Sequence, residues 1–370
     1  MKPDPETSLA KTQTVRVDLA QRGYDIEIGQ GNLCTLGEFL TARGRVTHAV
    51  VISDENVETP HGLAAAESLA AAVKKVDMIV VEPGEESKSI ASVATLWQGL
   101  LELGADRTTV VVAVGGGVVG DLAGFAAATY ARGIGFLQVP TSLLAQVDSS
   151  VGGKVGINLP DAKNMVGSFF QPRGVLIDTA TLATLSDREF RAGLGEVVKY
   201  GVILDATLFE YLEAHAAEVL ARQHDVLAQV IACCCRLKAE VVTQDEREET
   251  GIRAVLNYGH TVGHALESLS GYGTLLHGEA ISIGMTCAAR LAEKLGRVDA
   301  EFSARQRRLL EAFGLPIALP PLDRDKILEA MKHDKKVQHG RLRLVLPDRL
   351  GHVELVEDIA AGDLRAALEE

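Results

Sequence analysis

Three histidines in the segment 253–279 have the type and spacing of metal ligands. His260 and His264 are four residues apart, so on a helix they share one face. Apolar residues from Val255 to Leu269 recur at helical spacing around them. A glycine-rich bend, SGYGT, can then bring His277 to the same place. Neutral imidazole is a common zinc ligand, but histidines at this spacing also occur as ordinary core or surface residues.

Glu196, in LGEVVKYG, is a candidate oxygen ligand for the same ion. A glutamate with two histidines is a known catalytic zinc set, and three protein ligands leave one position open for chemistry. We therefore predict a metal site at Glu196, His260 and His277. HTVGH lacks the glutamate of the H-E-x-x-H signature, which argues against a metalloprotease.

The segment 108–133 predicts a strand, a glycine turn and a helix. Valines form the strand, and three consecutive glycines remove every side chain at its carboxyl end. Bare backbone before a helix N-terminus suits a pyrophosphate, and Gly115, Gly117 and Gly120 match G-x-G-x-x-G. Glycine runs also form plain turns, and no acidic residue ends a strand about twenty residues later. Asp54 or the EPGEESK loop, which ends in Lys88, then takes the ribose or adenine.

Basic residues in glycine-rich or helical contexts predict an anionic substrate with carboxylate and phosphate groups. Lys154 is flanked by glycines but is not in a P-loop, since the first glycine of that motif would fall on Asp148. A nicotinamide cofactor together with a Lewis-acid metal indicates oxidation of an alcohol. The basic candidates are Arg132, Lys154, Lys163, Lys199, Lys238 and Arg253.

The chain has 370 residues and a formal charge of −13, which predict two domains and exclude general binding to nucleic acid or anionic membranes. We expect a flexible tail at 1–13, an α/β nucleotide-binding domain with a mainly parallel sheet at 14–184, and a mainly helical metal and substrate domain at 185–370. Five cysteines without a C-x-x-C pair, and no signal peptide or membrane span, indicate the cytoplasm. Strands are expected at 14–28, 48–54, 76–88, 108–115, 135–140 and 175–179, and helices at 33–42, 60–73, 89–103, 118–131, 187–201, 205–219, 225–243 and 277–296.

Within residues 114–336 the sequence resembles the 3-dehydroquinate synthase family of sugar phosphate cyclases. The stretches that carry the resemblance, in family order, are VGGGVVGDLAGFAAATYARG, QVPTSLLAQVDSSVGGKVGIN, AKNMVGSFFQP, GLGEVVKYG, DEREETGIRAVLNYGHTVGHALE, LLHGEAISIGM and HDKK.

The resemblance implies that Glu196, His260 and His277 bind zinc or cobalt and that the chain binds NAD. The implied NAD contacts are Pro83, Gly84, Glu85, Glu86, Ser87, Lys88, Gly117, Val118, Val119, Gly120, Asp121, Thr141, Ser142, Lys154, Lys163, Thr181, Leu182, Ala183 and Thr184.

The resemblance also implies the reaction. The substrate, 3-deoxy-D-arabino-heptulosonate 7-phosphate, is oxidised transiently at C5, loses phosphate, is reduced, and closes by an intramolecular aldol step. His264 has a proton-transfer role, Asp148 holds a substrate hydroxyl, and Glu249 or Glu248 is the acidic partner of His264. The implied phosphate or carboxylate contacts are Arg132, Lys154, Asn164, Lys199, Lys238, Arg253, Asn257 and either Lys335 or Lys336.

Two other readings stay open at this point. Cyclases that form 2-deoxy-scyllo-inosose or valiolone rings share the implied metal and NAD sites. A metal-dependent polyol dehydrogenase also joins a glycine turn to a helical metal domain, but it needs no phosphate-binding cations and accumulates NADH. The family implies a homodimer.

Overall fold

The computed structural model describes residues 12–160, 162–271, 274–332 and 343–369. The chain forms two compact units. One comprises Met1–Leu185 with Leu227–Arg247, and the other Ser186–Val226 with Glu248–Glu370. The domain boundary placed at 184/185 from sequence remains a prediction. Residues 227–247, which that division assigns to the helical domain, pack with the first unit in the structure.

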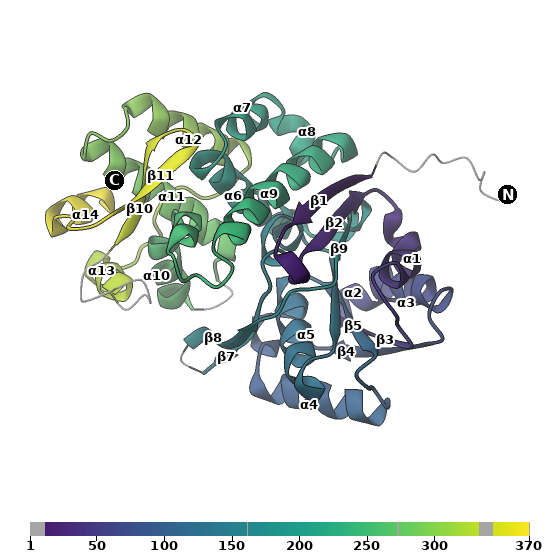
Figure 1. Cartoon of the computed structure of the whole chain (residues 1–370). Coiled ribbons are helices and arrows are strands. Elements are labelled where there is room, and N and C mark those ends of the chain that lie inside the picture. Colours follow the sequence, from purple (N-terminus) through teal and green to yellow (C-terminus); the bar gives the residue numbers. More distant parts are fainter. Residues whose placement is uncertain (1–11, 161, 272–273, 333–342, 370) are drawn as a thin grey trace. The chain divides into compact units, whose positions relative to one another are not determined.

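The first unit contains a seven-stranded sheet with the order β1-β2-β9-β6-β5-β3-β4. Only β1 runs antiparallel to its neighbour, so the expectation of a mainly parallel sheet is confirmed (Figure 1). The strands are β1 (Gln13–Val17), β2 (Tyr24–Gly29), β3 (His48–Asp54), β4 (Lys75–Val81), β5 (Thr109–Gly115), β6 (Gly135–Pro140) and β9 (Val175–Asp178).

Both faces of the sheet are covered by helices, which explains the continuous apolar strands. On β3, Val50 and Ile52 join the core formed with α4 (Ile90–Glu102) and α5 (Gly117–Thr129). The alternate β3 residues join the core on the other face. That second core contains α1 (Leu36–Thr41) and α3 (Leu63–Ala70), and the short α2 (Glu55–Val57) follows β3.

A hairpin of β7 (Lys154–Leu159) and β8 (Ala162–Phe169) was not anticipated from the sequence. Val155 and Ile157 of β7 are buried in the core that contains α5. The stretch 154–169 carries two glycines, a proline and few alternating apolar residues, so period-two patterning is weak there. The unit also includes most of α9 (His224–Gln244).

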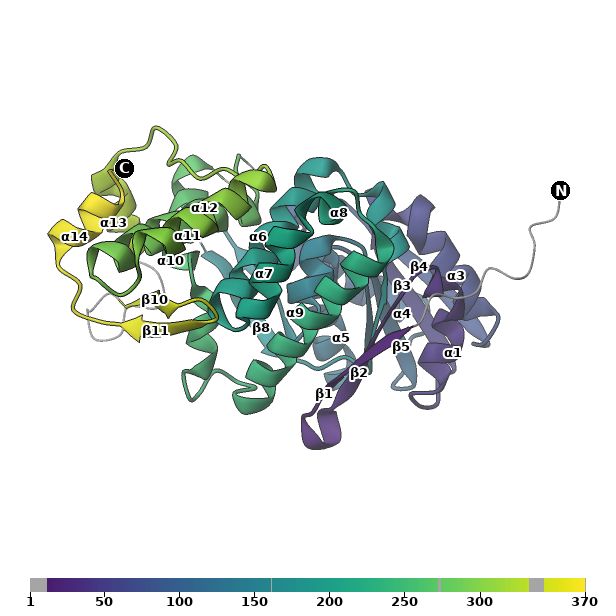
Figure 2. The same cartoon turned by 90° about the horizontal axis from the view of Figure 1, so that it is seen from above.

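The second unit is mainly helical, as expected, with one small hairpin (Figure 2). Its elements are α6 (Asp187–Ile203), α7 (Ala206–Ala214), α8 (Ala216–Leu220), α10 (His260–Ser270), α11 (His277–Lys294), α12 (Ala300–Ala312), α13 (Arg324–Lys332), β10 (Leu344–Arg349), β11 (His352–Val356) and α14 (Ala361–Ala367). One apolar core joins α10, α11, α13, β10 and α14. Among the described residues, no helix is long and apolar enough to cross a membrane.

The helix α10, which carries His260 and His264, begins later in the chain than the apolar spacing predicted. Val255 and Leu256 lie in a 3-10 segment, Ile252–Asn257, rather than on α10. Gly259 has a left-handed φ of 76°, which interrupts the helical backbone directly before His260. His260 is therefore the first residue of α10.

Candidate functional site

Glu196, His260 and His277 converge in the second unit. Glu196 Oε1 lies 3.5 Å from His260 Nε2 and 3.5 Å from His277 Nε2. Ligand atoms about 2.0–2.1 Å from a tetrahedral zinc ion lie about 3.3–3.4 Å from one another. The separations of Glu196 Oε1 from the two imidazole nitrogens therefore suit such an ion, the three donors all lie within 4.8 Å of one another, and their types fit it.

Close helix packing at glycines brings these donors together. A Cβ on Gly278 of α11 would collide with the carbonyl oxygen of Ala192 on α6, and one on Gly195 would lie 2.6 Å from the carbonyl oxygen of Gly278. A Cβ on Gly284 would collide with the carbonyl oxygen of Gly259. Glycine at these positions lets α6 and α10 approach α11, so residues from three helices reach one point.

The ring nitrogens facing away from the trio are also engaged. His260 donates through Nδ1 to the carbonyl oxygen of Tyr258, 3.0 Å away. His277 Nδ1 lies 3.3 Å from Oε2 of Glu267, which is buried. Such contacts fix the tautomer and ring orientation of a metal-binding histidine and direct Nε2 toward the ion.

Glu267 was missed in the sequence analysis. It lies seven residues after His260 and three after His264, so helical spacing puts it on their face of α10. A glutamate on that face was the available signal. Its carboxylate and that of Glu196 raise the pKa of His277 to about 10, although burial alone would lower it. A divalent cation held by these residues would take the place of this proton, because a ligating imidazole must be neutral.

Lys199 and His264 adjoin the trio. The buried Lys199 ammonium pairs with Oε2 of Glu196 one helical turn away. The His264 ring centroid lies 5.3 Å from that of His260 and 6.1 Å from that of His277. His264 is thus close to the predicted ligands, where a proton-transfer group would be needed.

The other predicted residues of this unit lie before α10 and after α13. Arg253 is buried, with its Nε 3.6 Å from Glu248 Oε1. Asn257 ends the same 3-10 segment. The structure thus gives Glu248 an arginine neighbour, while the assignment of Glu249 to His264 stays a prediction. Lys335 and Lys336 lie outside the described residues.

The predicted nucleotide turn is present in the first unit. Gly115 ends β5, Gly116 is the N-cap, and α5 begins at Gly117 without a capping side chain. A Cβ on Gly117 would lie 3.0 Å from Ser149 Oγ, and one on Gly116 would lie 3.4 Å from Ser142 Oγ. Backbone N–H groups at a helix start, with no side chain over them, suit a phosphate.

The EPGEESK loop contacts the start of α5 through Lys88. Its Nζ donates to Asp121 Oδ2 over 2.7 Å, and its side chain is 4% exposed. Burial acts to lower the pKa of Lys88, but the charges of Asp121 and Glu85 outweigh it and raise the pKa. Lys88 therefore remains a cation beside the glycine turn.

Further polar residues surround this turn. Gly152 and Gly153, with φ of 99° and 67°, make the bend that precedes the exposed Lys154. The ammonium of Lys238 contacts Asp148, 2.7 Å from its carbonyl oxygen and 3.0 Å from Oδ1. The structure therefore pairs two residues that the sequence analysis assigned separately to the substrate.

The remaining predicted contacts of this unit are distributed over loops and β8. Thr141 and Ser142 follow β6, and Thr181–Thr184 lie in the 3-10 segment Thr179–Thr184 after β9. Arg132 is exposed at φ 67°, beside Ala131 at φ 49°. Two successive non-glycine residues in the left-handed region mark a constrained turn, which is common where backbone positions a functional side chain. Lys163 and Asn164 lie on β8.

A glycine turn for an anion on a parallel sheet and a Glu–His–His donor set on helices define an enzyme that uses a nucleotide and a divalent metal. Residues 78–192 match the model of the 3-dehydroquinate synthase N-terminal region, and residues 193–337 match that of its C-terminal region. The chain belongs to the 3-dehydroquinate synthase family.

Relatives named 3-dehydroquinate synthase match nearly the whole chain. The protein of Rhodopirellula baltica is 48% identical over 362 residues, which cover 96% of each chain. That of Desulforamulus reducens is 48% identical over 358 residues, covering 96% of this chain and 99% of the relative.

Two solved structures of cyclases are similar to this chain over nearly its whole length. A 2-deoxy-scyllo-inosose synthase complexed with carbaglucose-6-phosphate, NAD+ and Co2+ has a TM-score of 0.88 and 30% identity, covering 96% of this chain and 99% of its own. The 2-epi-5-epi-valiolone synthase of Streptomyces hygroscopicus subsp. jinggangensis 5008, with NAD+ and Zn2+ bound, has a TM-score of 0.86 and 28% identity, covering 93% and 95%. A glycerol dehydrogenase of Schizosaccharomyces pombe, 16% identical with a TM-score of 0.69 over 92% and 87%, shares the fold alone.

Proposed function

We propose that the chain converts 3-deoxy-D-arabino-heptulosonate 7-phosphate to 3-dehydroquinate and phosphate, using NAD catalytically and a bound Zn2+ or Co2+. The main support for this proposal is sequence similarity. The chain is 48% identical, over 96% of its length, to proteins named for this activity. The convergence of Glu196, His260 and His277 supports the metal part.

When bound, the cation supplies a Lewis acid that lowers the pKa of a substrate hydroxyl, and NAD supplies a hydride acceptor. In the proposed sequence the C5 alcohol becomes a ketone, which acidifies the adjacent C–H. A base takes that proton, the electrons of the C–H bond form a C=C double bond, and phosphate leaves with the electrons of its C–O bond. Return of the hydride restores the alcohol, after which ring opening and aldol closure form the carbocycle. NAD is regenerated in each turnover.

The chain's own residues hold and orient these reactants. Glu196, His260 and His277 are the proposed metal ligands, and His264 beside them moves a proton. Asp148 orients a substrate hydroxyl and is itself held by Lys238. NAD is assigned to Pro83–Lys88, Gly117–Asp121, Thr141, Ser142, Lys154, Lys163 and Thr181–Thr184, and the phosphate and carboxylate to Arg132, Lys154, Asn164, Lys199, Lys238, Arg253, Asn257 and Lys335.

Two alternatives have weaker support. The cyclases of 2-deoxy-scyllo-inosose and valiolone type are 30% and 28% identical to this chain, well below the identity to the 3-dehydroquinate synthases. The polyol dehydrogenases share only the fold, at 16% identity. Sequence similarity therefore favours the heptulosonate substrate.

A substrate comparison tests the proposed activity. The chain is incubated with catalytic NAD, Zn2+ and one of the heptulosonate phosphate, sedoheptulose 7-phosphate or glucose 6-phosphate. We expect inorganic phosphate from the first alone, with no lasting NADH absorbance. Release from either of the others would assign the chain to a different cyclase type, and a stoichiometric rise in NADH would indicate a dehydrogenase.

Assembly and location are further parts of the proposal. We propose a cytoplasmic homodimer, supported by the family relationship and by five cysteines that include no C-x-x-C pair. Light scattering behind a sizing column measures the mass, and a monomer at assay concentration would contradict the dimer. Recovery of the native protein from a non-cytoplasmic cell fraction would contradict the location.

Glu267 is expected to support metal binding through His277. Glu267→Gln keeps an acceptor but removes the charge and should weaken Zn2+ binding about tenfold, while Glu267→Ala should weaken it up to about a hundredfold. Competition with a chromophoric chelator measures the affinity. Ser268→Ala, exposed on the same helix, is the control. Unchanged affinity in both Glu267 variants would leave the carboxylate with no role in holding His277.

A further inference from the structure

The hairpin β7–β8 contains an irregularity that the proposed reaction does not yet use. Ile157 pairs with Val166 and Leu159 pairs with Ala162, so the three residues 163–165 lie opposite Asn158 alone. Within this bulge Asn164 has φ of 53°, in the left-handed region. Bulges redirect side chains beside functional sites, and asparagine is one of the few non-glycine residues that adopts this conformation readily.

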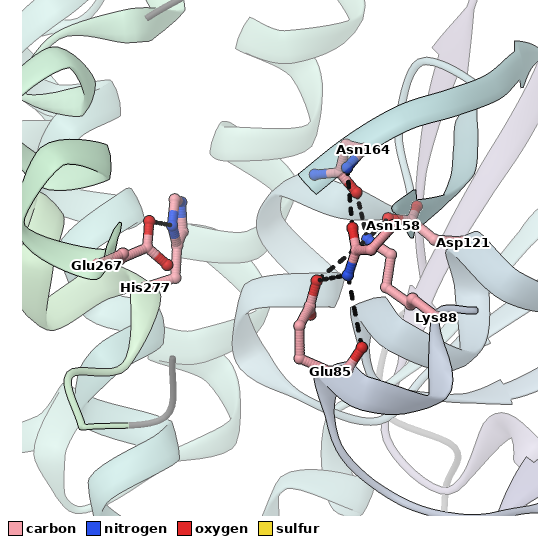
Figure 3. A network of polar contacts seen from close by, with 7 residues as sticks. All are labelled: Glu85, Lys88, Asp121, Asn158, Asn164, Glu267 and His277. Carbon is pink, nitrogen blue, oxygen red and sulfur yellow. Dashed lines mark hydrogen bonds and ion pairs between the residues drawn. The ribbon is translucent and has the colours of Figure 1, made fainter. Parts of the chain in front are cut away.

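Asn158 bonds both to the bulge and to the EPGEESK loop (Figure 3). Its side-chain Oδ1 accepts from the backbone N–H of Asn164 at 2.8 Å, and its Nδ2 donates to Glu85 Oε1 at 2.8 Å. Its backbone N–H donates to the carbonyl oxygen of Lys88 at 2.7 Å. One residue thus joins the bulge of the hairpin to the EPGEESK loop.

Lys88 makes a second connection between the same segments. Its ammonium donates to Asn164 Oδ1 at 2.5 Å and to Asp121 Oδ2 at 2.7 Å (Figure 3). The backbone of Asn164 is therefore held by Asn158, and its side chain by Lys88. The cation is buried, so these contacts are shielded from competing water.

We propose that Asn158 is a positioning residue that ties the bulge carrying Lys163 and Asn164 to the EPGEESK loop, so that contacts to NAD and contacts to the substrate are set by one network. The inference rests on the proposed function, which assigns the loop to NAD and Asn164 to the substrate. Asn158 itself touches neither reactant in this scheme. It acts by fixing the backbone of Asn164 and the carboxylate of Glu85.

Three substitutions test the Asn158–Asn164 bond and the Asn158–Glu85 bond separately. Asn158→Ala removes both, whereas Asn158→Asp keeps an acceptor for the Asn164 N–H but places a carboxylate against that of Glu85. In the double variant Asn158→Asp with Glu85→Gln, the new amide can donate to the new carboxylate and restore the link. Met165→Ala, exposed in the same bulge, is the matched control.

We expect Asn158→Ala and Asn158→Asp to lower kcat/KM for the heptulosonate phosphate by about 10- to 100-fold, because displacement of about 1 Å near a reacting centre can cost a hundredfold. We also expect weaker NAD binding by calorimetry, and faster amide hydrogen exchange in 154–169 measured without NAD. The double variant should return to within about threefold of Glu85→Gln alone, the behaviour of a restored pair. Met165→Ala should match the wild type.

The inference would be overturned if Asn158→Ala and Asn158→Asp both had the kinetics, NAD affinity and hydrogen exchange of the wild type. It would also be overturned if the double variant had a kcat/KM no higher than that of Asn158→Asp alone. If Asn158→Ala does not fold, the Asn158→Asp pair still decides the matter. A wild-type protein that releases no phosphate would refute the proposed function instead, and the exchange and NAD-binding measurements would still test the link.

Discussion

His260→Ala is expected to lower turnover by about a thousandfold or more, since a Lewis-acid metal contributes several kcal/mol to catalysis and each 1.36 kcal/mol is about tenfold in rate. The substitution removes the His260 imidazole, one of the three proposed metal ligands, whose Nε2 lies 3.5 Å from Glu196 Oε1. Metal content per chain, measured by elemental analysis, should fall with activity. Treating the wild type with a chelator should have the same effect, and zinc or cobalt should restore the rate.

His352→Ala is a suitable control, because His352 lies on the β10–β11 hairpin and bonds to Asp348. It should retain both metal and activity. Full turnover by the wild type after elemental analysis shows that the metal is gone would remove Glu196, His260 and His277 from the reaction.

Lys154→Ala is expected to lower kcat/KM by about 10²- to 10³-fold. Losing one partner of a desolvated charge pair costs about 2–5 kcal/mol, which spans that range at about 1.36 kcal/mol per tenfold. The structure places Lys154 at the start of β7, after two left-handed glycines, with an exposed side chain. An exposed lysine with no ligand to contact would contribute almost nothing.

Lys74 provides the comparison, since it is also exposed in the first unit and has no proposed role. Lys74→Ala should be within about twofold of the wild type, as is usual for surface substitutions. Equal rates for the Lys154 and Lys74 variants would show that the glycine-flanked lysine only shapes the loop.

The elements with strong local signals were predicted well. The valine run of β5 and the glycines after it specify a buried strand and a turn without side chains, and both are present. The cluster of His260 and His277 with Glu196 was predicted from ligand type. The distances could not be, because they depend on glycine contacts between α6, α10 and α11 that helical periodicity does not encode.

Other features depend on partners distant in the chain. The three-residue bulge at 163–165 needs Asn158 and the 85–88 loop, so neither its register nor the φ of Asn164 follows from local propensity. The packing of residues 227–247 with the first unit has the same origin: α9 has an ordinary helical pattern, and Lys238 meets Asp148 across ninety positions of sequence. Glu267 is a buried acid that contacts His277, ten positions later in the sequence.

In the proposed reaction, hydride leaves the substrate and returns to it within one turnover. Heptulosonate phosphate deuterated at C5 tests this directly, with the product analysed by NMR and mass spectrometry beside a phosphate assay. We expect one phosphate per product and deuterium retained at the carbon derived from C5. Deuterium accumulating in free NADH, or lost to solvent while phosphate is still released, would contradict it.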